Sequence, residues 1–140
     1  MAMSPAEAIA RRFIELYNDG TPESYGSDRV LELYADDVDW REFIPSARNP
    51  QGRSGSLAAL REAILANQGA LRNRRVRLHD VVAEPDRAAM RYAWEAEVGV
   101  DGTPFGRRGS VLRAEVAAFF KVADGKIVQC YEFGAFLPNG

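Results

Sequence analysis

The chain has 140 residues, 46% of them hydrophobic, with a formal net charge of −2 and an isoelectric point of about 5.5. The length fits one domain with a single core, and the acidic balance lacks the global basic field that nucleic-acid binding uses. One cysteine, Cys130, excludes an internal disulfide framework. The first residues lack the features of a signal peptide, and no apolar run approaches the roughly 18 residues of a membrane span. We therefore expect a cytoplasmic protein with neither nucleic-acid nor membrane partners.

The N-terminal quarter of the chain indicates two helices. Ser4 caps the first, Pro5 occupies its first position, and Asn18-Asp19-Gly20 stops it. Its apolar face contains Ile9, Phe13, Leu16 and Tyr17. After a loop, Ser27 or Asp28 caps a second, shorter helix. The buried side of that helix contains Val30, Leu31 and Tyr34.

The stretch Leu33–Phe43 combines aromatic and acidic side chains at strand spacing. We expect the second helix to end near Tyr34, a turn over 35–37, and then an extended run in which Val38, Trp40 and Glu42 share one face. If that face looks into an apolar cavity, Glu42 is a buried acid beside an indole, which raises a carboxyl pKa and suits proton transfer. On the surface, Glu42 would be solvated. This stretch alone leaves both alternatives open.

Residues 44–55 carry two prolines and two glycines, which predicts an irregular loop over whatever lies beneath. Ser56 then caps a third helix. The apolar positions at helical spacing are Leu57, Leu60, Ile64 and, at the end, Leu71. The arginines at 72, 74, 75 and 77 are interpreted as cations at the helix C-terminus, followed by a solvated strand face.

From position 75 onward the pattern changes to four strands. The first, 76–83, turns through 84–87 into a second with the clearest period of two in the chain. Its apolar face contains Met90, Tyr92, Trp94, Ala96 and Val98. The third strand has an unbroken apolar face of Leu112, Ala114, Val116, Ala118, Phe120 and Val122. A turn at Asp124-Gly125 leads to the fourth strand, 127–136.

The register of this last hairpin decides which side chains of the fourth strand face inward. A two-residue turn would turn inward the set Gln129, Tyr131 and Phe133. A three-residue loop over 123–125, with a left-handed Gly125 and a bulge after it, would turn inward the set Cys130, Glu132 and Gly134. We favour the second arrangement.

Three helices followed by four strands predict an α+β domain over residues 4–137, with the helices against one face of a curved antiparallel sheet. Three short motifs then point to a known family: residues 33–38 (LYADDV), Gly52-Arg53-Ser54-Gly55, and residues 123–128 (ADGKIV). Their order, with that of the helices and strands, resembles the SnoaL-like branch of the nuclear-transport-factor-2-like superfamily. The resemblance covers roughly residues 6–136. It implies a cone-shaped roll, the sheet wrapped around the helices, with a deep apolar pocket at the wide end, often in a homodimer.

Ketosteroid isomerase is another member of this superfamily, and the resemblance allows single positions to be compared. Glu42 falls where that enzyme has its aspartate base, which favours a proton shuttle. Phe13 and Ala118 stand where it has the two donors of its oxyanion hole, so that hole is absent here. Tyr92 could supply a hydroxyl that Phe13 does not.

Limonene epoxide hydrolase also resembles this chain. Glu132 and Trp40 fall where that enzyme has a catalytic aspartate and a catalytic tyrosine. Trp94 and Ala96 replace its arginine and second aspartate, which argues against epoxide hydrolysis. SnoaL-type cyclases need one pocket acid or base near the last strands, a role that Glu132 could fill.

We expect a pocket with aromatic walls and few polar groups, suited to a flat or alicyclic apolar ligand. Its predicted wall consists of Phe13, Tyr17, Trp40, Met90, Tyr92, Trp94, Ala118 and Cys130. Its predicted carboxylates are Glu42 and Glu132. Because two like charges in a low-dielectric cavity repel, one of them should keep its proton near neutral pH. Alternatively, Glu132 forms an ion pair with Arg91 or Arg113, or is exposed through the other hairpin register.

We predict no metal and no cofactor. His79 is the one histidine, and the sequence offers no ligand set with the spacing of a metal site. Asp36 and Asp37 are interpreted as turn residues that bond nearby backbone amides. Cys130 is interpreted as a small inward apolar residue rather than a nucleophile.

If these inward faces are right, aromatic side chains are exposed on the outer face of the last two strands. Such a patch usually marks an interface, which predicts a symmetric homodimer through the convex sheet face. The predicted contacts are Ala117, Phe119, Tyr131 and Phe133.

Two hypotheses follow for function. The first is a small cofactor-free enzyme of the isomerase or lyase class, performing isomerisation, dehydration or cyclisation of an apolar small molecule by proton transfer. Glu42 or Glu132 would be the base and the other the acid. The second is a non-catalytic binding module with the same pocket, in which the glutamates only satisfy ligand or backbone donors.

Overall fold

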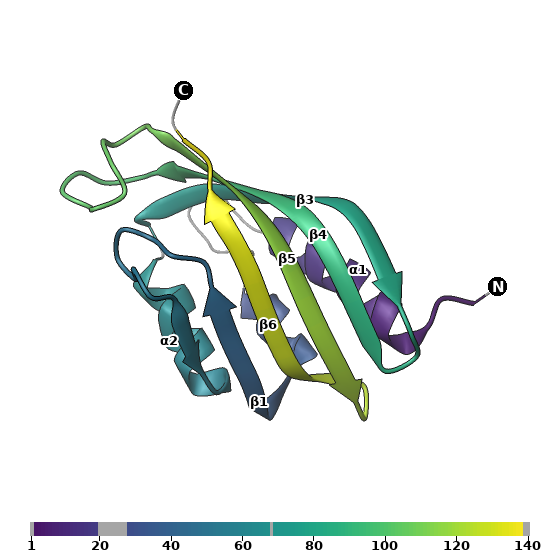
Figure 1. The fold of residues 1–140 in the computed structure, drawn as a ribbon. Coiled ribbons are helices and arrows are strands. Elements are labelled where there is room, and N and C mark those ends of the chain that lie inside the picture. The colour runs from purple at the N-terminus through teal and green to yellow at the C-terminus, as the bar shows by residue number, and fades with distance from the viewer. Residues whose placement is uncertain (1, 20–27, 68, 139–140) are drawn as a thin grey trace.

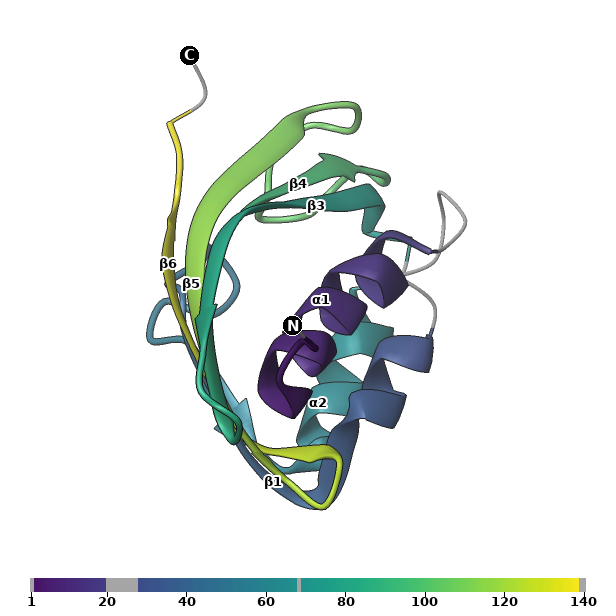
Figure 2. The same cartoon turned by 90° about the vertical axis from the view of Figure 1, so that its right-hand side faces the viewer.

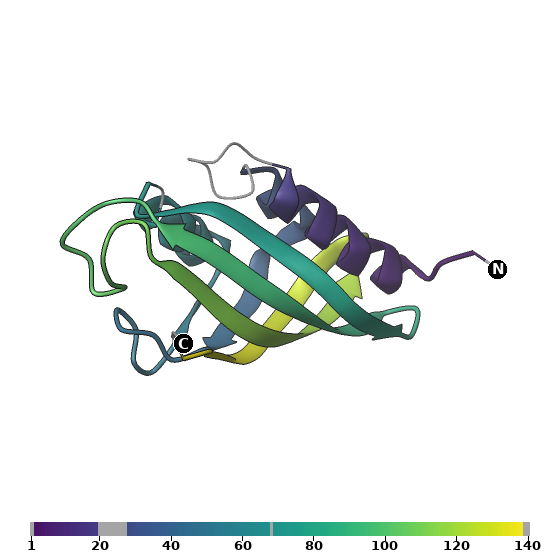
Figure 3. The same cartoon turned by 90° about the horizontal axis from the view of Figure 1, so that it is seen from above.

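A computed structural model describes residues 2–19, 28–67 and 69–138. One curved sheet of six strands carries two α-helices, both on its concave side (Figures 1 and 2). The elements in chain order are α1 (Pro5–Asn18), a 3₁₀ helix η1 (Asp28–Leu33), β1 (Tyr34–Phe43), β2 (Arg53–Gly55), α2 (Leu57–Ala66), β3 (Leu71–Ala83), β4 (Arg87–Val98), β5 (Val111–Ala123) and β6 (Lys126–Phe136). Seen from above, α1 runs beside β3 (Figure 3).

The α+β class is confirmed, and the sheet is larger than predicted. Its strand order is β2-β1-β6-β5-β4-β3. Strands β3 to β6 form the predicted antiparallel meander, whereas β1 joins β6 in parallel, so the sheet is mixed. Three N-terminal helices are not confirmed, because α2 follows β1 and β2 and the second helix is a 3₁₀ helix. None of the helices in the described part of the chain has the length and apolarity that crossing a bilayer requires.

Helix α1 begins where the sequence predicts. The Ser4 Oγ accepts a hydrogen bond from the Glu7 amide at 3.2 Å, and Pro5 fits the first turn because its missing N–H has no partner there. The buried face consists of Ala6, Ala10, Phe13, Leu16 and Tyr17. Gly20, part of the predicted stop, and Ser27, one of the alternative caps, lie outside the described residues.

Strand β1 starts earlier than predicted. Residues 35–37, predicted as a turn, are already strand, because Tyr34 pairs with β6. Further along, Val38 and Trp40 are buried and Glu42 follows on the same face, as the two-residue period predicts.

The predicted loop 44–55 ends in a short strand. Strand β2 pairs antiparallel with β1 and places Arg53 directly opposite Glu42. Gly52 permits this return of the chain, because its φ is +80° and a Cβ there would collide with the carbonyl oxygen of Glu42. The loop 44–52 is thereby held close to the end of β1.

Strand β3 also starts early, at Leu71, which therefore belongs to the sheet and not to the third helix. Asn73 has a left-handed φ of 54°, and the pairing with β4 shifts between Arg72 and Arg75. Within this irregularity Arg74 faces inward and is only 2% exposed. The interpretation of these arginines as cations at a helix C-terminus is therefore wrong, because α2 ends at Ala66 without a basic residue in its last turn. The interpretation as a solvated strand face is wrong for Arg74.

Strands β4 and β5 follow the predicted alternation. All the predicted inward positions are buried except Trp94, which is partly buried. Helix α1 packs mainly against β3, and also against these two strands.

The last hairpin has the predicted inward face, but the chain reaches it differently. Asp124 and Gly125 form a two-residue turn with φ of 51° and 76°, the left-handed pair that a type I′ turn requires. The pairing with β5 then shifts, which leaves Val128 as an extra residue in β6. This bulge, and not a three-residue loop, brings Cys130 and Glu132 to the inner face.

Candidate functional site

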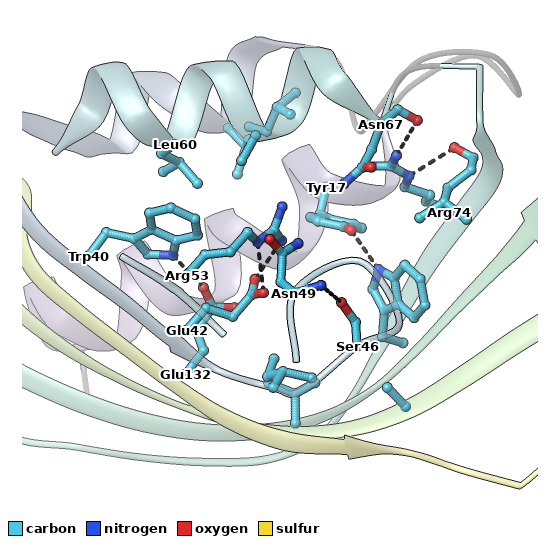
Figure 4. Close-up of a pocket in the computed structure, with 18 of the residues that line it drawn as sticks. Tyr17, Trp40, Glu42, Ser46, Asn49, Arg53, Leu60, Asn67, Arg74 and Glu132 are labelled. Carbon is cyan, nitrogen blue, oxygen red and sulfur yellow. Dashed lines mark hydrogen bonds and ion pairs between the residues drawn. The ribbon is translucent and has the colours of Figure 1, made fainter. Parts of the chain in front are cut away.

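A cavity of about 100 Å³ lies between the concave face of the sheet and the helices (Figure 4). Apolar side chains from both α-helices and from β3, β5 and β6 form much of its wall, including Phe13, Leu60, Ile64, Leu71, Val116 and Phe136. The lining side chains with polar atoms are Tyr17, Tyr34, Trp40, Glu42, Ser46, Asn49, Arg53, Asn67, Arg74, Tyr92, Trp94 and Glu132.

Glu132 projects from β6 into this cavity and is the most strongly perturbed acid of the site (Figure 4). The Trp40 indole N–H donates to its Oε1 at 3.0 Å, and the Tyr92 hydroxyl donates to its Oε2 at 3.0 Å. Burial, and then the charge of Glu42, raise the pKa of Glu132 from 4.5 to about 7, although the two hydrogen bonds and Arg53 act in the opposite direction. Near neutral pH both its acid and its carboxylate are present, as a group that gives and takes protons requires.

Glu42 is neither a lone buried acid nor a solvated one. Arg53 donates to both of its oxygens, from Nε at 3.0 Å and from Nη2 at 2.9 Å. The side chains are 15% exposed for Glu42 and 27% for Arg53. The Arg53 guanidinium carbon also lies 5.6 Å from the ring centroid of Trp40, a cation–π contact. A bidentate pair of this kind engages Glu42 as a carboxylate.

The two acids meet because β1 and β6 pair in parallel. Glu42 and Glu132 are partners in this register, so their side chains lie side by side on the inner face. The alternative partners of Glu132 are engaged elsewhere, since Arg91 and Arg113 each pair with an exposed acid at 3.2 Å.

Aromatic side chains form the rest of the wall. The Trp94 indole N–H donates to the Tyr17 hydroxyl oxygen at 2.6 Å. The Phe13 ring lies 5.7 Å from the Tyr17 centroid and 6.1 Å from the Tyr92 centroid. The ring faces thus form an apolar surface on which a flat ligand can pack.

The structure brings together most of the predicted pocket residues. Those in the lining are Phe13, Tyr17, Trp40, Glu42, Tyr92, Trp94 and Glu132. Met90, Ala118 and Cys130 are buried in the adjacent core and do not line the cavity. On β4 and β5, Met90 pairs with Ala118, and the next inward-facing pair is Tyr92 with Val116. Only the second pair lines the cavity, so the cavity ends between the two pairs.

Cys130 is close to the acid although it does not line the cavity. Its Sγ lies 3.8 Å from Glu132 Oε1, and burial raises the pKa of the thiol well above its ordinary value. This agrees with the interpretation of Cys130 as an inward apolar residue rather than a nucleophile.

Sequence reasoning missed several polar residues of the lining: Ser46, Asn49, Arg53, Asn67 and Arg74. A signal for Arg53 was present, because opposite charges at Glu42 and Arg53 flank a loop rich in proline and glycine, as in a hairpin pair. Arg74 donates to two backbone carbonyls, those of Leu71 at 2.9 Å and Asn67 at 2.8 Å. No sequence pattern indicated its burial.

The described residues contain no group of three His, Cys, Asp or Glu side chains that could hold a metal ion. His79 Nε2 lies 3.1 Å from the Glu115 carboxylate. Asp36 and Asp37 are exposed strand residues and not the predicted turn.

These observations define a class of protein: a curved α+β roll with an aromatic cavity and a largely buried carboxyl. The SnoaL-like domain family matches residues 10–130, and the chain belongs to this family. The resemblance to the SnoaL-like branch of the nuclear-transport-factor-2-like superfamily is thereby confirmed. No curated protein sequence matches the chain.

Solved structures share the fold at low sequence identity. RV0760c from Mycobacterium tuberculosis, in complex with estradiol-17beta-hemisuccinate, has a TM-score of 0.70 and 20% identity over 94% of this chain and 94% of that one. The proposed polyketide cyclase IdmH from Streptomyces antibioticus has a TM-score of 0.66 and 18% identity, covering 90% of this chain and 91% of that one. The proposed hydroxylase AclR from Streptomyces galilaeus has a TM-score of 0.70 and 14% identity, covering 91% and 76%. At these identities the likeness establishes the fold.

Proposed function

We propose that this chain is a small cofactor-free enzyme that transfers protons on an apolar small molecule, with Glu132 as the group that carries the proton. The observation that supports this most is the Glu132 carboxyl, held by Trp40 and Tyr92 in an aromatic cavity with a pKa of about 7. Isomerisation, dehydration and cyclisation each take a proton from one atom and return it to another. One carboxyl poised near neutral pH can do both steps.

Glu42 and Arg53 complete the proposed site as a charge pair. Both Glu42 oxygens are bonded to Arg53, which favours Glu132 over Glu42 as the exchanging group. The charge of Glu42 raises the pKa of Glu132 and the charge of Arg53 lowers it, so the pair sets the basicity of the carboxyl.

The cavity supports a ring-containing ligand. Its volume of about 100 Å³ is of the same order as the ~150 Å³ of a protein cavity that holds benzene, so the enclosed part of the ligand is about one small ring. A larger ligand would extend through the mouth. The estradiol ester bound by RV0760c and the cyclase activity proposed for IdmH agree with a ligand of this class.

A deuterium-exchange experiment tests the proposed proton transfer without the natural substrate. In D₂O, the wild-type chain should accelerate deuterium incorporation next to the carbonyl of 2-cyclohexen-1-one, followed by NMR. Glu132→Gln, which is near-isosteric, should lose the acceleration by roughly 10²–10⁴-fold. Glu95→Gln, on the exposed face of β4, is the matched control. Equal rates for wild type and Glu132→Gln, with ligand binding retained, would favour the binding module instead.

We also propose that the convex face of the sheet pairs with a second copy of the chain. Phe43, Phe119 and Phe133 are 44–48% exposed there. The Phe43 and Phe133 rings stack at 4.8 Å, and the Phe119 ring lies edge-on to Phe133 at 5.8 Å. The predicted contacts Ala117 and Tyr131 lie on the same face and are partly buried. A continuous aromatic patch across β1, β6 and β5 fits a symmetric interface.

A further inference from the structure

The loop before β2 presents an amide side chain to the cavity. Asn49 belongs to the loop 44–52, and its side chain lies between the Glu42–Arg53 pair and Ser46 (Figure 4). It lines the same cavity as Glu132.

The backbone of Asn49 is fixed by three hydrogen bonds. Its amide donates to Ser46 Oγ at 2.9 Å, and its carbonyl accepts from the amides of Ser46 and Gly52, both at 3.0 Å. Because β2 pairs with β1 directly after Gly52, this turn is anchored to the strand that carries Glu42. The side chain therefore projects from a rigid support, as a binding residue should.

The side-chain amide of Asn49 differs from the neighbouring polar groups of the cavity in its hydrogen bonding. Around it, Trp40 and Tyr92 donate to Glu132, Arg53 donates to Glu42, and Trp94 donates to Tyr17. Within residues 2–19, 28–67 and 69–138, the Asn49 amide makes no side-chain hydrogen bond to the protein. An entirely apolar ligand would remove water from this amide without replacing its hydrogen bonds, which costs binding free energy. A ligand with an oxygen acceptor at this point avoids the cost.

We propose that Asn49 binds the carbonyl oxygen of the ligand through its Nδ2–H, so that the substrate class is a cyclic ketone or enone. This assignment rests on the proposed role of Glu132. The Glu132 carboxylate takes a proton from a saturated carbon next to the carbonyl, or next to a double bond conjugated with it, and the C–H electron pair forms a new carbon–carbon double bond. The carbonyl π pair moves to oxygen, where the Asn49 N–H stabilises the negative charge. Return of the proton from Glu132 to another carbon restores the ketone and the carboxylate.

Asn49 also explains how the site works without the donors of ketosteroid isomerase. Phe13 and Ala118 cannot donate a hydrogen bond, and the Tyr92 hydroxyl is directed to Glu132. An amide from the loop supplies a donor from a different element of the fold.

A pair of probes tests this assignment by binding alone. The probes are 2-cyclohexen-1-one and 3-methylidenecyclohexene, in which a CH₂ group replaces the carbonyl oxygen, titrated by NMR. Asn49→Leu should bind the enone roughly fivefold more weakly, the factor expected for one neutral hydrogen bond, and should bind the hydrocarbon no more weakly than wild type does. Gln51→Leu makes the same kind of change on an exposed side chain of the same loop and should alter neither affinity.

The outcomes separate this assignment from the proposed role of Glu132. Unchanged enone affinity in Asn49→Leu, equal weakening of both probes, or no enone binding by the wild-type chain would overturn it. Selective enone loss in Asn49→Leu, together with undiminished deuterium exchange in Glu132→Gln, would support the Asn49 site while refuting the Glu132 role. Unchanged enone affinity in Asn49→Leu, with exchange lost in Glu132→Gln, would do the opposite.

Discussion

At the scale of single residues, Glu132 combines burial with two hydrogen-bond donors. Desolvation alone would favour the neutral acid, while the Trp40 and Tyr92 donors favour the carboxylate. The opposing effects leave the pKa at about 7 rather than far above it. A carboxyl in this balance exchanges its proton at little cost in either direction, which is what a shuttle needs.

This pKa makes the stability of the protein depend on pH. The folded value of about 7 exceeds the ordinary 4.5, so between these values the folded state binds more protons than the unfolded state does. The free energy of unfolding should therefore fall as the pH rises through this window, by up to ~3 kcal/mol. Urea unfolding of wild type and Glu132→Gln at pH 4.5 and pH 8 measures this contribution, because the other titrations cancel. A stability difference between the two that does not change with pH would contradict the prediction.

Which single residues reach the cavity could be predicted only in part. The two-residue period correctly placed Trp40 and Tyr92 on the inner face. Glu132 also faces inward as predicted, but a bulge and not the predicted three-residue loop places it there. The period does not show where an ion pair forms. The period therefore did not decide whether Glu42 is buried or solvated, and it did not indicate Arg53 as the partner of Glu42. Arg74 depends on a left-handed residue in β3, and side-chain type alone does not reveal such an irregularity.

At the scale of elements, hydrophobic alternation recovered the meander, whereas the chain's local irregularities were harder to predict. The inner face of β6 depends on a bulge at Val128, and a turn motif such as Asp124-Gly125 cannot locate a bulge further along the strand. The parallel pairing of β1 with β6 joins segments from the two halves of the chain. A single sequence contains no local signal for such a pairing.

The outer faces of the same strands lead to a prediction about assembly. If Phe133 lies at the centre of a dimer interface, Phe133→Lys should place unpaired charges in it and convert a dimer of twice 15.5 kDa into single chains. Leu65→Lys is the control, because Leu65 is 51% exposed on α2, on the helical side of the sheet. Sedimentation equilibrium distinguishes the masses. A wild-type chain that sediments at 15.5 kDa would refute the proposed interface.

At the scale of the whole molecule, the curved sheet keeps an open cavity beside a well-packed core. The paired residues Met90 and Ala118 are packed in the core, whereas the next inward pair, Tyr92 and Val116, faces the cavity. Membership of the SnoaL-like family accounts for this architecture, but one fold of this kind can host unrelated reactions. The proposed chemistry therefore depends on the side chains that line the cavity, with Glu132 at the centre.

The titration of Glu132 tests this account most directly. The chain has two tryptophans, so two indole N–H signals are expected in a ¹H–¹⁵N spectrum. The Trp40 signal should shift with a midpoint near pH 7, because its N–H donates to Glu132, whereas the Trp94 signal, bonded to Tyr17, should not. Glu132→Gln should abolish the shift. A midpoint near the ordinary 4.5, or a Trp40 signal that does not respond to pH in the folded chain, would contradict the account.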